Sequence, residues 1–146
     1  MRRALVLGAL TVAMLLTACN EEDDMGLQER AEERAAQARA HVDDLARRVG
    51  QDPEIRMDEL TECIPGQEDS GIDLVYIVRV QTVGDSERVL DDVSNQMASE
   101  GWRVVRDPDS GGTVKARFGK EGFSMGARIS TSSGLATISG TGGCVQ

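Results

Sequence analysis

The sequence predicts a two-layer α/β (α+β) sandwich, in which a mostly antiparallel sheet of about five strands is covered by one helix and preceded by a long N-terminal amphipathic helix. Two patterns support this fold. Residues 25–49 repeat apolar side chains every three or four positions, whereas the last third of the chain alternates apolar and polar residues between glycine-rich turns. A length of 146 residues suits one domain with one core.

The first element is a helix over residues 25–50. Its apolar stripe is Leu27, Ala31, Ala35, Ala38, Val42, Leu45 and Val49. Because the first half of this stripe is mostly alanine, we expect only the second half to dock on the core. Gly50 and Pro53 end the helix. The stripe also suits the seam of a coiled-coil dimer.

The next predicted elements are a central strand and the helix that covers the sheet. Residues 72–83 alternate, and Val75 and Ile77 make the middle of this strand apolar on both faces. Asp85 or Ser86 caps a helix that runs to about residue 100, where Gly101 ends it. Trp102, directly after that helix, is expected to anchor the core.

Four short strands complete the prediction, at residues 102–106, 113–119, 123–130 and 135–139. Turn residues between them indicate consecutive hairpins and an antiparallel meander. In 123–130 the apolar residues alternate with four that should face solvent. These four are Ser124, Gly126, Arg128 and Ser130. One face of the sheet is therefore apolar and needs a helix over it.

The N-terminus has the pattern of a secretory signal peptide. Arg2 and Arg3 precede an apolar run at residues 4–16, and small residues follow it. The run of 13 positions is shorter than the roughly 20 residues that cross a hydrocarbon core. We therefore expect cleavage rather than a permanent transmembrane helix.

The signal ends in Leu16-Thr17-Ala18-Cys19, which resembles the lipobox of bacterial lipoproteins. The resemblance implies cleavage before Cys19 and acylation of its sulfur by fatty acids such as palmitate, which would anchor the chain on the extracytoplasmic face of the cell membrane. In plan the chain is similar to the small actinobacterial LppA-like cell-envelope lipoproteins, a group of uncharacterised function.

These patterns divide the chain into four segments. They are a signal peptide (1–18), a lipidated acidic tether (19–24), an amphipathic helix (25–50) and an α/β domain (51–146). The net charge of −9 becomes −11 once the two arginines of the signal are lost. This negative net charge disfavours nucleic acid as a partner, because phosphate backbones attract basic surfaces. The expected partners are the membrane, through lipid on Cys19, and an envelope protein.

Cys63 and Cys144 are the only cysteines left once Cys19 carries lipid. Disulfides persist in exported proteins, and two cysteines allow only one pairing. We therefore predict a Cys63–Cys144 disulfide. The alternative is two reduced, buried thiols.

No motif identifies catalytic, cofactor-binding or metal-binding residues. His41 is the single histidine and is expected on the solvated flank of the first helix. The loop at 107–111 lacks the distal acid of an EF-hand, and the glycines at 140–143 lack the lysine of a phosphate loop. The carboxylate pairs Asp91/Asp92 and Glu59/Glu62 are typical of solvated surfaces.

The sequence therefore predicts a membrane-anchored lipoprotein with a non-catalytic binding domain and no cofactor. Two alternatives remain. One is an enzyme that acts on envelope polymers, which requires a cleft with converging carboxylates or hydroxyls. The other is a structural lipoprotein that self-associates through its first helix, which requires an exposed stripe from Leu27 to Val49.

Overall fold

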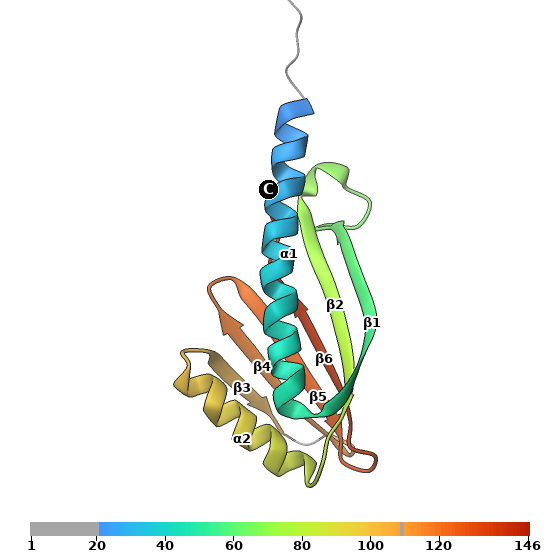
Figure 1. Cartoon of the computed structure of the whole chain (residues 1–146), viewed down its shortest axis with the longest axis vertical. Coiled ribbons are helices and arrows are strands. Elements are labelled where there is room, and N and C mark those ends of the chain that lie inside the picture. Colours follow the sequence, from blue (N-terminus) through green and yellow to red (C-terminus); the bar gives the residue numbers. More distant parts are fainter. Residues whose placement is uncertain (1–20, 109) are drawn as a thin grey trace, which may run out of the picture.

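The computed structural model describes residues 21–108 and 110–146, so the expected signal peptide and Cys19 lie outside the described residues. Two helices and six strands follow one another along the chain (Figure 1). They are α1 (Glu21–Val49), β1 (Gln51–Glu62), β2 (Ile72–Gln81), α2 (Ser86–Ser99), β3 (Arg103–Asp107), β4 (Thr113–Lys120), β5 (Phe123–Ser130) and β6 (Leu135–Thr141). No helix among the described residues is both long and apolar enough to cross a membrane.

The strands form one antiparallel sheet in the order β1-β2-β6-β5-β4-β3. Strands β3 to β6 are the predicted meander, and the last strand, β6, lies beside β2 in the middle of the sheet. The predicted α+β class is confirmed, but the number of strands is six rather than five. The sequence prediction missed β1 because most of this edge strand is exposed, contains Pro53 and carries two register shifts.

Both helices pack on the same face of the sheet. The helix α1 contacts β2 and β6, whereas α2 contacts β3 and β4 (Figure 1). Asp85 caps α2 by accepting a hydrogen bond from the backbone N–H of Arg88 at 2.9 Å, as predicted. Trp102 is buried in the core between the helices and the sheet, also as predicted.

The helix α1 ends at Val49, directly before Gly50, as predicted, but it differs from its prediction in where it begins and in how much of it docks. It begins at Glu21, so four residues assigned to an extended tether are helical. Its alanine half also docks, since Ala31, Ala35 and Ala38 are at most 3% exposed.

Small residues let α1 approach the sheet closely. A Cβ atom added to Gly140 of β6 would lie 2.3 Å from Val42 Cγ2. The apolar stripe of α1 is thus covered by the sheet of its own chain from Ala31 onward. The alternative of self-association through the first helix requires an exposed stripe, and this part of the stripe is covered.

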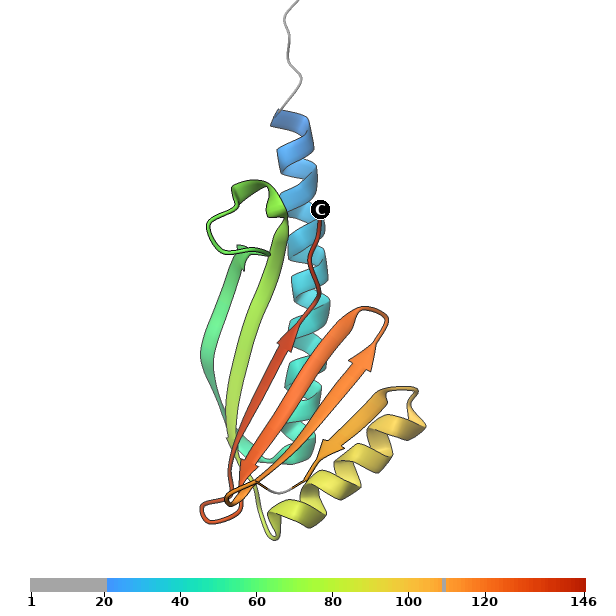
Figure 2. The same cartoon turned by 180° about the vertical axis from the view of Figure 1, so that it is seen from behind.

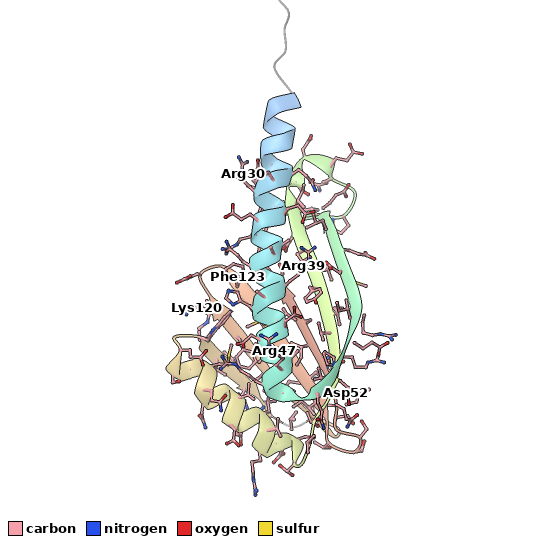
Figure 3. The ribbon with its side chains drawn as sticks, viewed as in Figure 1. Arg30, Arg39, Arg47, Asp52, Lys120 and Phe123 are labelled. Atoms are coloured by element: carbon pink, nitrogen blue, oxygen red, sulfur yellow. A yellow bond between two sulfur atoms is a disulfide. The ribbon has the colours of Figure 1, made fainter. Side chains whose placement is uncertain are left out.

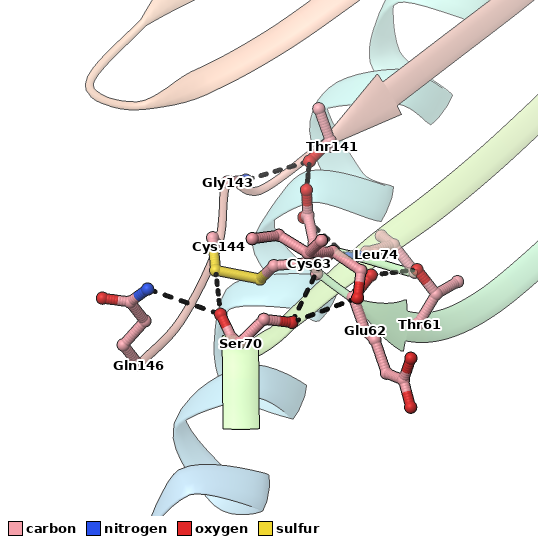
Figure 4. Close-up of a disulfide and its surroundings, with 11 residues drawn as sticks. Thr61, Glu62, Cys63, Ser70, Leu74, Thr141, Gly143, Cys144 and Gln146 are labelled. Carbon is pink, nitrogen blue, oxygen red and sulfur yellow. Dashed lines mark hydrogen bonds between the residues drawn. A yellow bond between two sulfur atoms is a disulfide. The ribbon is translucent and has the colours of Figure 1, made fainter. Parts of the chain in front are cut away.

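The predicted disulfide between Cys63 and Cys144 is confirmed, with 5.7 Å between the two Cα atoms (Figure 4). It joins the segment after β1 to the segment after β6. Backbone hydrogen bonds support the same junction, because Ile72 and Val145 each donate to the other's carbonyl oxygen at 2.9 and 2.8 Å. The C-terminus is thereby held against the start of β2.

Candidate functional site: the open face of the sheet

The second face of the sheet carries no helix among the described elements. Figure 2 views the molecule from this side, with β6, β5 and β4 in front of α1. Residues that alternate with the core residues point to this open face. On β5 they are the four that the sequence predicted to face solvent, and Arg128 is indeed exposed.

Three basic residues cross the open face in one row. The strand register places Arg79 of β2 opposite Thr137 of β6, Thr137 opposite Arg128 of β5, and Arg128 opposite Lys115 of β4. Neighbouring strands lie about 4.8 Å apart. Arg79, Arg128 and Lys115 are called the cationic row below.

Carboxylates at both ends of the cationic row are engaged by other arginines. Glu54 lies opposite Arg79 but forms its ion pair with Arg56. Asp107 lies opposite Lys115 but pairs with Arg117 at 3.0 Å. The charge of the cationic row is therefore not compensated by its nearest acidic neighbours.

Most other basic side chains of the described residues have a polar partner. Nine of them bind a carboxylate or a backbone carbonyl: Arg30, Arg34, Arg39, Arg47, Arg48, Arg56, Arg106, Arg117 and Lys120. Of the five with no such partner within the described part of the chain, only Arg88 lies on α2. The others, Arg79, Arg103, Lys115 and Arg128, all lie on the open face.

Arg79 also has a hydrogen-bond donor without a partner in the described part of the chain. Its Nε atom is buried and has no hydrogen-bond partner among the described residues. A buried donor without a partner costs about 1–3 kcal/mol.

A shallow trough of small residues lies beside the cationic row. Its floor is Ser124 and Gly126 of β5 and Ser139 of β6, with Gly126 directly opposite Ser139. Two adjoining hollows of about 520 Å³ each share Gly126 and Ser139 of this floor, and Arg117 and Ile77 line both. Exposed apolar side chains of β1 and β2, among them Met57 and Val75, border the opposite side.

Gly126 is not explained by backbone conformation or by core packing. Its φ is not positive, and an added Cβ would lie 3.5 Å from Ser139 Oγ, an ordinary contact. Glycine weakens the interior of a strand and often marks a position where a ligand approaches the backbone. Gly140 differs, because its missing side chain makes room for Val42.

His41 was predicted on a solvated flank, and this was wrong. It is half-buried, and its ring lies edge-on to the rings of Trp102 and Phe123 at centroid distances of 5.1 and 4.8 Å. Burial lowers the pKa of His41, and the charge of Lys120 lowers it further. Figure 3 shows Lys120 and Phe123 beside α1, the helix that carries His41.

The carboxylate pairs do not converge. Glu59 points to the open face and Glu62 to the other, since three positions separate them on one strand. On α2, Asp91 pairs with Arg106 while Asp92 is exposed. Within the described residues no group of three or more His, Cys, Asp or Glu side chains could hold a metal ion.

No family model matches this chain, and no curated protein or solved structure shows significant similarity to it. The open face is therefore interpreted from its own geometry. The sequence analysis identified Arg128 as solvent-facing but missed the cationic row, because the row depends on which strands are neighbours.

Proposed function

We propose that this chain is an extracytoplasmic lipoprotein, anchored through lipid on Cys19, whose folded domain binds an anionic partner on the open face of its sheet and has no catalytic role. The lipobox-like motif supports the anchor. The cationic row and the trough support the binding site. The alternative of an enzyme is less well supported, because the carboxylates that line the trough are engaged: Asp73 accepts a hydrogen bond from Thr141, and Asp107 pairs with Arg117.

A single observation carries the binding proposal. Lys115 and Arg128 lie directly opposite each other on adjacent strands, and neither has a partner of opposite charge among the described residues. Like charges in this arrangement destabilise a sheet. A protein with a net charge of −9 has many carboxylates that could neutralise them, yet the nearest one across the sheet, Asp107, pairs with Arg117 instead.

The cationic row lies where it would face a partner at a distance from the membrane to which Cys19 is anchored. The helix α1 has 29 residues and so is about 43 Å long. Arg79 lies two residues before Gln81, whose carbonyl oxygen is 2.4 Å from a Cβ added to Gly50, directly after α1. The row therefore lies near the end of α1 that is farther from Cys19.

Binding to simple polyanions tests the proposal. We expect the purified full chain, in neutral detergent, to bind inorganic polyphosphate but not neutral dextran of similar length. Arg128→Gln should weaken polyphosphate binding about tenfold, the loss typical of one charge-assisted hydrogen bond. Calorimetric titration measures this.

Arg88→Gln is the matched control. Like Arg128, Arg88 is exposed and its side chain has no partner within the described residues, but it lies on α2. Equal losses in the two variants would mean that overall charge, not the open face, governs binding. That result would refute the proposed site.

A further inference from the structure

The chemistry of the open face also indicates which anionic partner it holds, an inference that rests on the proposed function. We propose that the partner is a phosphodiester polymer, a chain of polyol or sugar units joined by phosphates, which lies along the trough beside the cationic row. Three features of the open face support this assignment: the spacing of its positive charges, the floor of the trough and its lack of aromatic side chains.

The spacing of the cations matches a chain with regularly repeated anions. Lys115 and Arg128 are neighbours across two strands, about 5 Å apart, and Lys115 and Arg117 are separated by about 7 Å along β4. The donors come from different strands, so no single guanidinium group supplies the site. The two non-bridging oxygens of a phosphodiester can accept charge-assisted hydrogen bonds from the ammonium of Lys115 and the guanidinium of Arg128 together.

The floor of the trough suits a thin chain with hydroxyl groups. Ser124 and Ser139 are exposed and offer hydroxyls that can donate or accept hydrogen bonds. Gly126 between them lets a chain approach the backbone. The exposed side of Val75, which is 36% accessible, can contact the carbon skeleton of the polymer.

Aromatic residues are absent from this face. The chain contains one Trp, one Tyr and two Phe, and all four are buried in the core: Tyr76, Trp102, Phe118 and Phe123. Hot spots of protein interfaces are enriched in Trp, Tyr and Arg, and single-stranded nucleic acids bind through bases stacked on aromatic rings. A folded protein or a nucleic acid therefore fits less well than a flexible polyanion.

A second copy of the chain is also disfavoured as the occupant. If two open faces met, the cationic row of one would lie against the cationic side chains of the other. Like charges placed together across an interface cost several kcal/mol.

The experiment compares two polymers with equal numbers of charges, poly(glycerol phosphate) and poly-L-glutamate. Calorimetric titration uses the full chain in neutral detergent at fixed low salt. We expect poly(glycerol phosphate) to bind roughly tenfold more tightly, the difference of about one charge-assisted hydrogen bond. Arg128→Gln should lower the slope of log affinity against log salt concentration by about one.

Substitutions at Gly126 test the position of the polymer. Gly126→Ile fills the trough, whereas Gly126→Ala adds one methyl group, and both should fold because the added Cβ makes only an ordinary contact. We expect a loss of tenfold or more for the Ile variant and about twofold for the Ala variant, as the trough is progressively filled. Thermal unfolding of both variants verifies the fold.

The outcomes separate the two proposals. If polyglutamate binds as tightly as poly(glycerol phosphate) and Arg128→Gln still weakens it, the phosphodiester assignment is wrong but anion binding on the open face stands. If Gly126→Ile has no effect on either polymer, the trough is not the site. If neither polymer binds, the proposed function fails as well.

Discussion

Lys115 and Arg128 occupy directly opposed positions on β4 and β5, and within the described residues neither pairs with a carboxylate. Their nearest acidic neighbour across the sheet, Asp107, is bound by Arg117. A sheet optimised only for stability would place opposite charges here. The arrangement therefore suggests that stability has been traded for binding on the open face.

The first prediction is that Arg128→Glu stabilises the folded chain while it abolishes polyanion binding. The variant replaces a like-charge pair with an opposite-charge pair, which should raise the free energy of unfolding by roughly 0.2–1 kcal/mol. Urea unfolding at low salt measures the gain, and added salt should reduce it. A loss of stability would show that Arg128 has a structural role instead.

The second prediction contrasts two glycines of the sheet. Gly140→Ala should lower the free energy of unfolding by about 1–3 kcal/mol, because the new Cβ would collide with Val42 and push α1 from the sheet. Gly126→Ala should leave stability unchanged or raise it, since its Cβ makes only an ordinary contact with Ser139 Oγ, at 3.5 Å, and glycine is a poor strand residue. Equal effects in thermal unfolding would contradict this account.

Period-two and helical patterns accounted for most elements because they report which residues face the core. They predicted α2, the meander β3 to β6 and the solvent-facing side of β5. The edge strand β1 was missed because its two faces are both mostly exposed, so its apolar residues do not alternate. The full docking of α1 was missed because alanine has little apolar surface to bury, although it permits close approach to the sheet.

The open face required knowledge of strand order. Alternation alone indicates that Lys115 and Arg128 point away from the core, but Arg79 joins them only because β6 pairs with β2 as well as β5. That pairing links residues about 60 positions apart. The net charge of −9 also gave no indication of the cationic row, because a total charge does not report how charges are distributed over the surface.

The third prediction concerns the pH dependence of stability. Burial lowers the pKa of His41 below its ordinary value of 6.5, and Lys120 and Arg34 add to this while Asp44 opposes it. The unfolded chain therefore takes up a proton more readily than the folded one. The contribution of His41 to stability is complete above pH 6.5 and is lost as the pH falls below 6.5 toward the lower pKa of the folded state.

The variant His41→Phe isolates this effect. It keeps an aromatic ring against Trp102 and Phe123 but cannot titrate. The difference in unfolding free energy between the variant and the wild type should be constant above pH 7 and should move in favour of the variant below pH 6.5. A constant difference from pH 5 to 8 would contradict a lowered pKa of His41.

The fourth prediction tests the membrane anchor. Expression of the full chain in a bacterial host should yield a protein whose N-terminal residue is a lipid-modified Cys19, as the motif from Leu16 to Cys19 implies. Cys19→Ser should abolish both the modification and cleavage at this site. Mass spectrometry decides the matter, and an unmodified Cys19 in the wild type would remove the proposed anchor.

The fifth prediction is that loss of the Cys63–Cys144 disulfide lowers the free energy of unfolding by about 4 kcal/mol. The bridge closes a loop with a sequence separation of 81, and the entropy that such a closure removes from the unfolded chain corresponds to about this value. The folded state should keep its shape, because the backbone bonds between Ile72 and Val145 remain. Urea unfolding of wild type and Cys63→Ser/Cys144→Ser measures the difference. Reductant should destabilise the wild type but not the variant, and an unfolding midpoint that reductant leaves unchanged in both would mean that the bridge contributes nothing to stability.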